Sequence, residues 1–396
     1  MKKTVITTCC PPAHVNECAG TGISTSASTD TTACDDTQSV EHKKRFYQID
    51  FIRFLFALMI MYGHLLAFLT IKYKESTLFS SLQVMSSYSG LLIVFSFFIM
   101  SGFFLYHSEG FKKYDLEAFA KRRILRLWPI LAFSYIPYIL IGTYRVYPDT
   151  LNLFFVTNAA GLMQETSQNA ASWYVCVLFV LSLFFFYALR HFRWEKVAFV
   201  CGIIALFGFI VRGTGSTTLY KAAPIASMPF MINGMIEGLA GISLGILIGA
   251  FLKRKLETKR IVSKKKKFLF GLFEIAALFF FVYHMSFHKP AGEFIFWEIL
   301  FIIIFVSFLF EEGFFSRFLN NKFSAWLGDL SYPIYLMHFP MIAVMNEYIW
   351  QKPFLKGDLN VLFVSIAICL LASLVADYFV KWLLKFYTKK KSYVKL

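Results

Sequence analysis

The stretch FLFALMIMYGHLLAFL, residues 54–69, decides the fold class. With its flanks it forms an apolar block over 50–70, and about 20 apolar residues are enough for a helix to cross a bilayer. The block also contains Arg53 and His64. A charged side chain at the bilayer centre costs roughly 2.5–3.5 kcal/mol on insertion scales, so an ionisable residue there usually has a partner or a function. The stretch therefore predicts a membrane helix that carries chemistry.

Nine further apolar blocks follow it. The chain is 57% hydrophobic and only 16% charged, whereas soluble domains are roughly 25% charged. We therefore expect an all-α, polytopic integral membrane protein with about ten transmembrane helices. A shorter apolar stretch over 151–163 favours an interfacial or re-entrant helix. The nine further spans are expected at 88–107, 126–146, 172–190, 196–212, 231–252, 268–287, 293–310, 330–350 and 361–384.

The formal net charge of +16 has its explanation in membrane topology rather than in nucleic acid, which we do not expect as a partner. Lys and Arg concentrate in every second segment between the blocks, most densely over 253–267. Positive residues favour the cytoplasmic side. The pattern predicts a multi-pass protein of the plasma (inner) membrane, in contact with the lipid bilayer, with both termini in the cytoplasm.

The composition divides the chain into three segments. Residues 1–45 are rich in Thr, Ser, Ala and Asp without apolar periodicity, which predicts a disordered cytoplasmic tail. Residues 46–386 form the transmembrane domain, and 387–396 form a basic cytoplasmic tail. The N-terminal tail contains side chains that could hold a metal. Their spacing fits no common zinc pattern, so we expect no metal. These side chains are Cys9, Cys10, His14 and Cys18.

Two predicted spans carry histidines at similar depth. His64 follows Arg53 by three helical turns, on the same face and ~16 Å further along the axis. In LGDLSYPIYLMHFP, residues 327–340, Ser331, Tyr335 and His338 share one helical face. A neutral His can accept a proton from a hydroxyl near neutral pH. The structural alternative is that Arg53 reaches the interface and His64 bonds a neighbouring helix.

The third block opens with KRRILRLWP, residues 121–129. Arg123 and Arg126 lie on one helical face at the inner membrane edge, and paired guanidinium groups suit a phosphate. Trp173 and Tyr174 open the fourth block, where aromatic residues can also be a plain interfacial belt. The apolar blocks hold four acids without an assigned role, of which the first is the best reserve candidate for the site: Glu237, Glu274, Glu298 and Asp377.

Five segments, in their order along the chain, resemble the acyltransferase-3 family of membrane O-acyltransferases, in particular the surface polysaccharide O-acetyltransferase type. The resemblance covers about residues 46–386. It implies acetyl-CoA or another acyl-CoA as a cytoplasmic co-substrate, and a glycan or lipid-linked saccharide as the acceptor. The five segments are IDFIRFLFALMIMYGH (49–64), FSFFIMSGFFL (95–105), RRILRLWP (122–129), ASWY (171–174) and LGDLSYPIYLMHFP (327–340).

The resemblance also implies roles for individual residues. Arg123 and Arg126 would hold the CoA phosphates, and Arg53 would assist there or steady the thioester. His64 would be the general base, supported by His338. We further expect contacts to the substrate from Trp173, Tyr335 and Ser331. A secondary transporter or flippase for a glycan or an acylated small molecule is the alternative, and a membrane sensor or structural protein is a third.

Overall fold

The computed structural model describes residues 45–82, 87–155, 167–213, 233–258, 263–287, 294–352 and 357–393. These ranges are helical and contain no strand, so the all-α prediction is confirmed for them. The predicted N-terminal tail lies outside the described residues except for Arg45.

Within the described residues, each of the ten predicted blocks falls mainly on helix. Among the described residues, six helical segments are long and apolar enough to cross a membrane: Tyr47–Lys72, Gly90–Lys113, Ser172–His191, Gly234–Glu257, Lys264–Ser286 and Asp358–Phe386. The long helices are α1 (Tyr47–Lys72), α3 (Ser87–His107), α5 (Leu116–Phe133), α8 (Ser172–His191), α9 (Trp194–Gly213), α10 (Asn233–Glu257), α11 (Lys264–Phe287), α12 (Phe294–Phe310), α14 (Lys322–Val344) and α15 (Asp358–Tyr393). The short ones are α2 (Thr77–Leu82), α4 (Gly110–Lys113), α6 (Ile136–Leu140), α7 (Val146–Leu153), α13 (Phe314–Leu319) and the π-helix η2 (Met345–Ile349).

The third block differs most from its predicted bounds of 126–146. Helix α5 begins at Leu116, because the Asp115 side chain caps it by accepting a hydrogen bond from the Ala118 amide at 2.7 Å. It ends at Phe133, and Pro137 in the first turn of α6 has no N–H to continue it. The block is therefore two helices rather than one.

The interfacial helix predicted over 151–163 can be compared with the structure only over its first five residues. Helix α7 covers Val146–Leu153 and so includes 151–153, and Phe155 just beyond it has a left-handed φ of 59°. Asp149 accepts a hydrogen bond from the Arg145 amide at 2.9 Å, which stabilises the early start of this helix. The part of the prediction over 156–163 lies outside the described residues.

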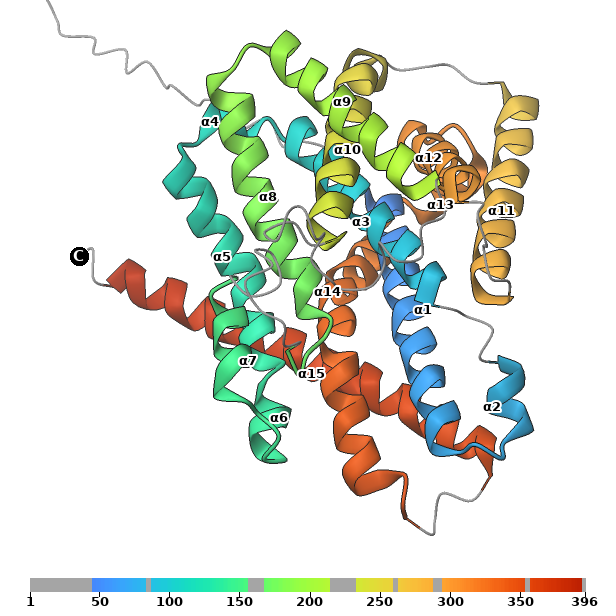
Figure 1. Cartoon of the computed structure of the whole chain (residues 1–396). Coiled ribbons are helices and arrows are strands. Elements are labelled where there is room, and N and C mark those ends of the chain that lie inside the picture. The colour runs from blue at the N-terminus through green and yellow to red at the C-terminus, as the bar shows by residue number, and fades with distance from the viewer. Residues whose placement is uncertain are drawn as a thin grey trace, which may run out of the picture. The chain divides into compact units, whose positions relative to one another are not determined.

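Helices α3 and α10 pack against each other near the centre of the view (Figure 1). A Cβ atom at Gly102 would overlap the backbone of Ile242, and one at Gly245 would overlap the backbone of Ile99. Membrane helices commonly approach through such small residues. In the span that contains α3, 67% of the residues are buried, against 33% in those of α11 and α15. We conclude that α3 is central, whereas α11 and α15 present apolar side chains to the surroundings.

Contacts between helix ends agree with the predicted alternation of helix direction. Glu109, beyond the end of α3, pairs with Lys253 near the end of α10 at 2.5 Å. Arg45, before α1, pairs with Asp329 of α14 at 2.8 Å, and Lys381 of α15 lies 3.5 Å from the same carboxylate. Each of these ends belongs to a segment that the charge pattern places on the inner side.

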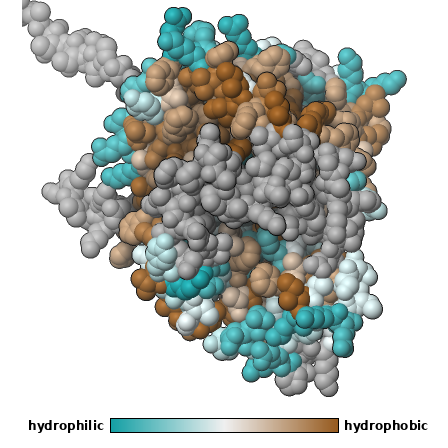
Figure 2. All heavy atoms as spheres, in the orientation of Figure 1, coloured by the Kyte–Doolittle hydropathy of each residue, from teal (hydrophilic) through white to brown (hydrophobic). Residues whose placement is uncertain are grey.

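The opposite ends of the same helices also meet. The Tyr73 hydroxyl, beyond the end of α1, donates to the Trp350 carbonyl at 2.7 Å, and Ser76 donates to Asp358 at the start of α15. Figure 2 shows hydrophilic side chains at the upper edge and at the lower right, with many hydrophobic ones between them. The hydrophobic side chains that this view shows next to the hydrophilic upper edge are suited to contact with lipid.

Candidate functional site

The two predicted histidines lie against each other. Helices α1 and α14 pack side by side, and the ring centroids of His64 and His338 are 5.3 Å apart, with 16° between the ring planes. Phe339 contacts both rings, at 4.7 Å from His64 and 4.6 Å from His338. His338 is fully buried, whereas His64 is half-buried. The pair therefore has one accessible and one enclosed imidazole.

The hydrogen bonding of His338 assigns its tautomer. Its Nδ1 lies 3.3 Å from the carbonyl oxygen of Ile334. A carbonyl only accepts, so Nδ1 carries the proton and donates it to this bond. The lone pair is then on Nε2, which is buried and has no hydrogen-bond partner within the described residues. His338 thus presents an unused hydrogen-bond acceptor beside His64.

Two tyrosines continue the site away from the histidines. The buried Tyr335 ring lies 6.0 Å from His338 and 5.4 Å from Tyr174, which opens α8. Tyr174 is only 7% exposed, which excludes it from an interfacial belt. It also interacts electrostatically with Arg53 and Arg123. Tyr174 therefore connects the histidine pair with the arginine end of the site.

Trp173 and Ser331, also predicted to contact substrate, lie elsewhere. Trp173 packs on Phe98 at 6.2 Å and against Gly234 of α10. Ser331 is buried, and its hydroxyl donates to the Gly328 carbonyl in the same helix at 2.7 Å. Neither has a ring contact or hydrogen bond to the histidine pair within the described ranges.

The arginines of α1 and α5 form the second part of the site. Arg53, Arg123 and Arg126 interact electrostatically with one another, as three like charges. Arg123 is half-buried, and Arg126 is accessible although protein atoms surround it closely. Such a group is suited to bind an anion with several oxygens, such as a phosphate.

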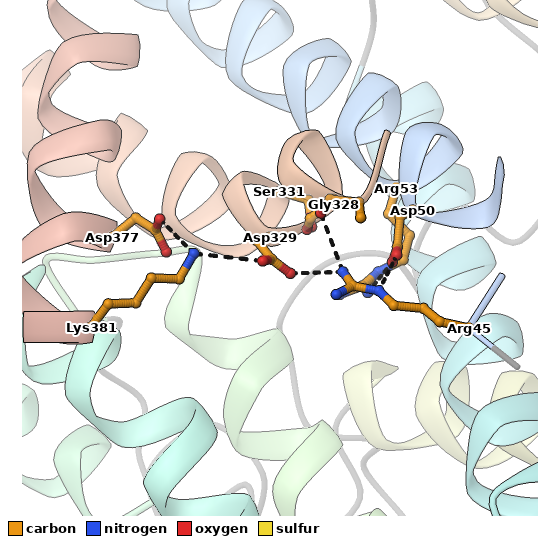
Figure 3. A network of polar contacts seen from close by, with 9 residues as sticks. Arg45, Asp50, Arg53, Gly328, Asp329, Ser331, Asp377 and Lys381 are labelled. Carbon is orange, nitrogen blue, oxygen red and sulfur yellow. Dashed lines mark hydrogen bonds and ion pairs between the residues drawn. The ribbon is translucent and has the colours of Figure 1, made fainter. Parts of the chain in front are cut away.

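Carboxylates offset part of this positive charge (Figure 3). Asp50 accepts from Arg53 Nη1 at 3.3 Å and from Arg45 Nε at 2.7 Å, and Asp329 accepts from Arg45 Nη2 at 2.8 Å. Burial lowers the pKa of Arg45, but its hydrogen bonds to Asp329 and Asp50 outweigh this and raise the pKa above its ordinary value. Arg45 therefore stays charged.

Sequence reasoning missed Asp50, Arg45, Asp329 and Tyr174 as parts of the site. One signal was present for Asp50, because it lies three residues before Arg53 and hence on the same helical face. For Tyr174, position at the start of a block suggested a belt residue. No signal in the sequence links Arg45 with Asp329, which are far apart in the chain.

The four acids of the apolar blocks that had no assigned role are either hydrogen-bonded or buried in the structure. Glu274 of α11 accepts from the Ser316 amide at 2.9 Å and so caps α13. Asp377 accepts from Lys381 at 2.8 Å. Glu237 and Glu298 are buried on α10 and α12. Within the described residues no group of His, Cys, Asp or Glu side chains is arranged to hold a metal, and the cysteine-containing tail lies outside them.

Helices that can span a bilayer, a buried imidazole with a free lone pair and an adjoining cationic cluster occur together in this chain, and ionisable groups among membrane helices are typical of a functional site. Residues 46–379 match the family model of the acyltransferase domain, acyltransferase-3. The chain therefore belongs to the acyltransferase-3 family, and it is a membrane acyltransferase. Comparison with curated proteins and with solved structures finds no match in either set. Family membership favours the acyltransferase over the transporter or flippase.

Proposed function

We propose that the protein transfers an acyl group, with acetyl as the first expectation, from an acyl-CoA to a hydroxyl of a cell-surface glycan or lipid-linked saccharide. The observation that carries this proposal is the contact between His64 and His338. Tyr335 and Tyr174 join this pair to the arginines of α1 and α5. One end of the site is suited to a phosphate-bearing donor and the other to proton transfer.

The arginines act on the donor in this proposal. Arg123 and Arg126 bind the CoA phosphates, and Arg53 contributes a third guanidinium at the end of α1. The site is ~16 Å long, since three helical turns separate Arg53 from His64. The pantetheine arm spans this length and brings the thioester to the histidine pair.

The histidines act on the acceptor. His64, the more accessible imidazole, removes the proton from the acceptor hydroxyl as this oxygen attacks the thioester carbonyl. The carbon–oxygen bond forms and the carbon–sulfur bond breaks. His64 then gives the proton that it took from the hydroxyl to the leaving CoA thiolate. The His338 Nε2 lone pair accepts a hydrogen bond from the acceptor or from the protonated His64. Tyr335, which contacts His338, lines the acceptor side.

The proposed topology has ten spans and both termini in the cytoplasm of the plasma membrane. Besides the six helices already described, α5 with α6, α9, α12 and α14 would cross. This arrangement puts the arginine end of the site on the cytoplasmic side, where acyl-CoA is available. The preference of Lys and Arg for cytoplasmic loops supports it.

The test is the glycan O-acyl content of cells that lack the protein and are complemented with wild type, His64→Ala or His191→Ala. We expect wild type to restore the labile esters and His64→Ala to lose roughly 10²–10⁴-fold in transfer rate. His191 is an exposed histidine at the end of α8, so His191→Ala serves as the matched control. Membrane levels of all three are measured.

Full activity of His64→Ala would remove His64 as the base and leave His338 as the next candidate. A deletion that changes no acylated glycan or glycolipid would contradict the proposed acceptor.

A further inference from the structure

Helix α14 contains a break in its backbone hydrogen bonding next to His338. Pro340 has no N–H, so the carbonyl of Leu336, four residues earlier, loses its partner within the helix. A buried carbonyl that is left unpaired destabilises the fold, so such a group usually finds another donor. The Asn169 side chain, from the segment before α8, donates from Nδ2 to this carbonyl at 3.2 Å. The bond is two residues from His338.

The Asn169 side chain is completely buried, and its surroundings orient it. Because the Leu336 carbonyl only accepts, the amide nitrogen must face α14. The same nitrogen donates to Ser134 Oγ beyond α5 at 2.8 Å. The Asn169 backbone carbonyl accepts from Ser172 Oγ in the first turn of α8 at 2.7 Å. Asn169 therefore ties the turn that carries His338 to α5 and α8.

We propose that Asn169 is a positioning residue for His338. It replaces the hydrogen bond that Pro340 removes, and so it holds this turn of α14 with the His338 ring stacked on His64. The inference rests on the proposed function, because it assumes that His338 serves the acyl transfer. Without Asn169, the Leu336 carbonyl would have to turn toward another donor, and the His338 ring would move with the backbone.

The first experiment measures kcat and KM for Asn169→Ala, Pro340→Ala and the double variant in membranes. We expect Asn169→Ala to lower kcat about tenfold with little change in the donor KM, because about 1.4 kcal/mol is a tenfold change in rate. Pro340→Ala returns an N–H to the Leu336 carbonyl, so the double variant should recover most of the loss. An unrecovered double variant would overturn the proposal.

Asn152→Ala is the matched control. Asn152 is buried in the same polar region, and its amide donates to Tyr135 at 3.2 Å and Ser172 at 2.9 Å, without a hydrogen bond to α14 within the described residues. Pro340→Ala should not rescue it. In a His338→Gln background, Asn169→Ala should have no further effect on kcat, whereas a general folding defect would lower kcat in both backgrounds and overturn the positioning role.

The second experiment does not depend on activity. The rate at which diethyl pyrocarbonate modifies His338, followed by peptide mass spectrometry on the purified full chain, should rise at least several-fold in Asn169→Ala. It should return to the wild-type rate with Pro340→Ala and stay unchanged in Asn152→Ala. An unchanged rate in Asn169→Ala overturns the inference even if wild type transfers acyl groups. A changed rate without any acyl transfer by wild type would instead reject the proposed function alone.

Discussion

The buried carboxylate of Asp50 decides how the positive charges at one end of the site are held. It is 5% exposed and accepts hydrogen bonds from Arg45 and Arg53, while Arg126 is in electrostatic reach. Asp50 packs directly against Gly328 of α14, and a Cβ atom at position 328 would overlap the Asp50 side chain. The position of Arg53 thus depends on Asp50, a side chain of α1 that is packed against α14.

We expect Asp50→Asn to destabilise the protein by about 1–3 kcal/mol and to raise the donor KM, because the shape is kept while a buried, charge-assisted acceptor is lost. Thermal unfolding in detergent and donor titration measure the two effects. Asp377→Asn is the control, since its partner Lys381 is 52% exposed and such pairs contribute about 0–1 kcal/mol. Equal destabilisation by the two substitutions would contradict the special role of Asp50.

Among the helices, the α3–α10 pair depends on two glycines, Gly102 and Gly245, each of which lies against the backbone of the other helix. Gly245 lies directly on the backbone of α3, at Ile99. Any side chain there must separate the two helices, which also changes the place of Tyr174, since Phe98 of α3 packs on it at 4.7 Å. Close helix packing and the shape of the site are therefore coupled.

Gly245→Leu should reduce accumulation of folded protein in the membrane severely, because overpacking costs about 1–3 kcal/mol where side chains can adjust, and more where the new side chain meets backbone, as here. Gly202→Leu on α9 is the matched control, since nothing lies within 4 Å of a Cβ placed there. Membrane levels and thermal unfolding of both variants are compared with wild type. Normal levels and stability of Gly245→Leu would show that α3 and α10 are not packed this closely.

At the scale of the whole molecule, the charge pattern predicts the direction of each helix, and the contacts between the ends of α1, α3, α10, α14 and α15 agree with that prediction. The proposed topology puts Lys265, at the start of α11, in the cytoplasm and Lys352, beyond η2, outside. A membrane-impermeant maleimide applied to intact cells should label Lys352→Cys, whereas Lys265→Cys should react only after permeabilisation. The tail cysteines Cys9, Cys10, Cys18 and Cys34 are replaced by Ser in both variants and in the background protein. The remaining cysteines, Cys176, Cys201 and Cys369, are buried. The reverse labelling pattern would invert the orientation.

Much of this architecture follows from local sequence. Apolar blocks of about 20 residues must form helices in lipid, because the backbone groups have no water to bond. The block boundaries were correct for α1, α3 and α8 within a few residues. They failed for α5 and α14, where the capping side chains of Asp115 and Asn321 start the helix before the apolar run begins. Cap residues act through a hydrogen bond that hydropathy does not register.

The sequence by itself determined the helical class, the family motifs and the residue types that carry chemistry, because these depend on composition and on spacing within one helix. Only the tertiary structure decided that His64 stacks on His338, that Asp50 joins Arg45 to Arg53, and that Asn169 bonds the carbonyl which Pro340 frees. His64 and His338 lie far apart in the chain, as do Asn169 and Pro340. Helical periodicity predicts the face on which a residue lies but not the neighbour that this face meets.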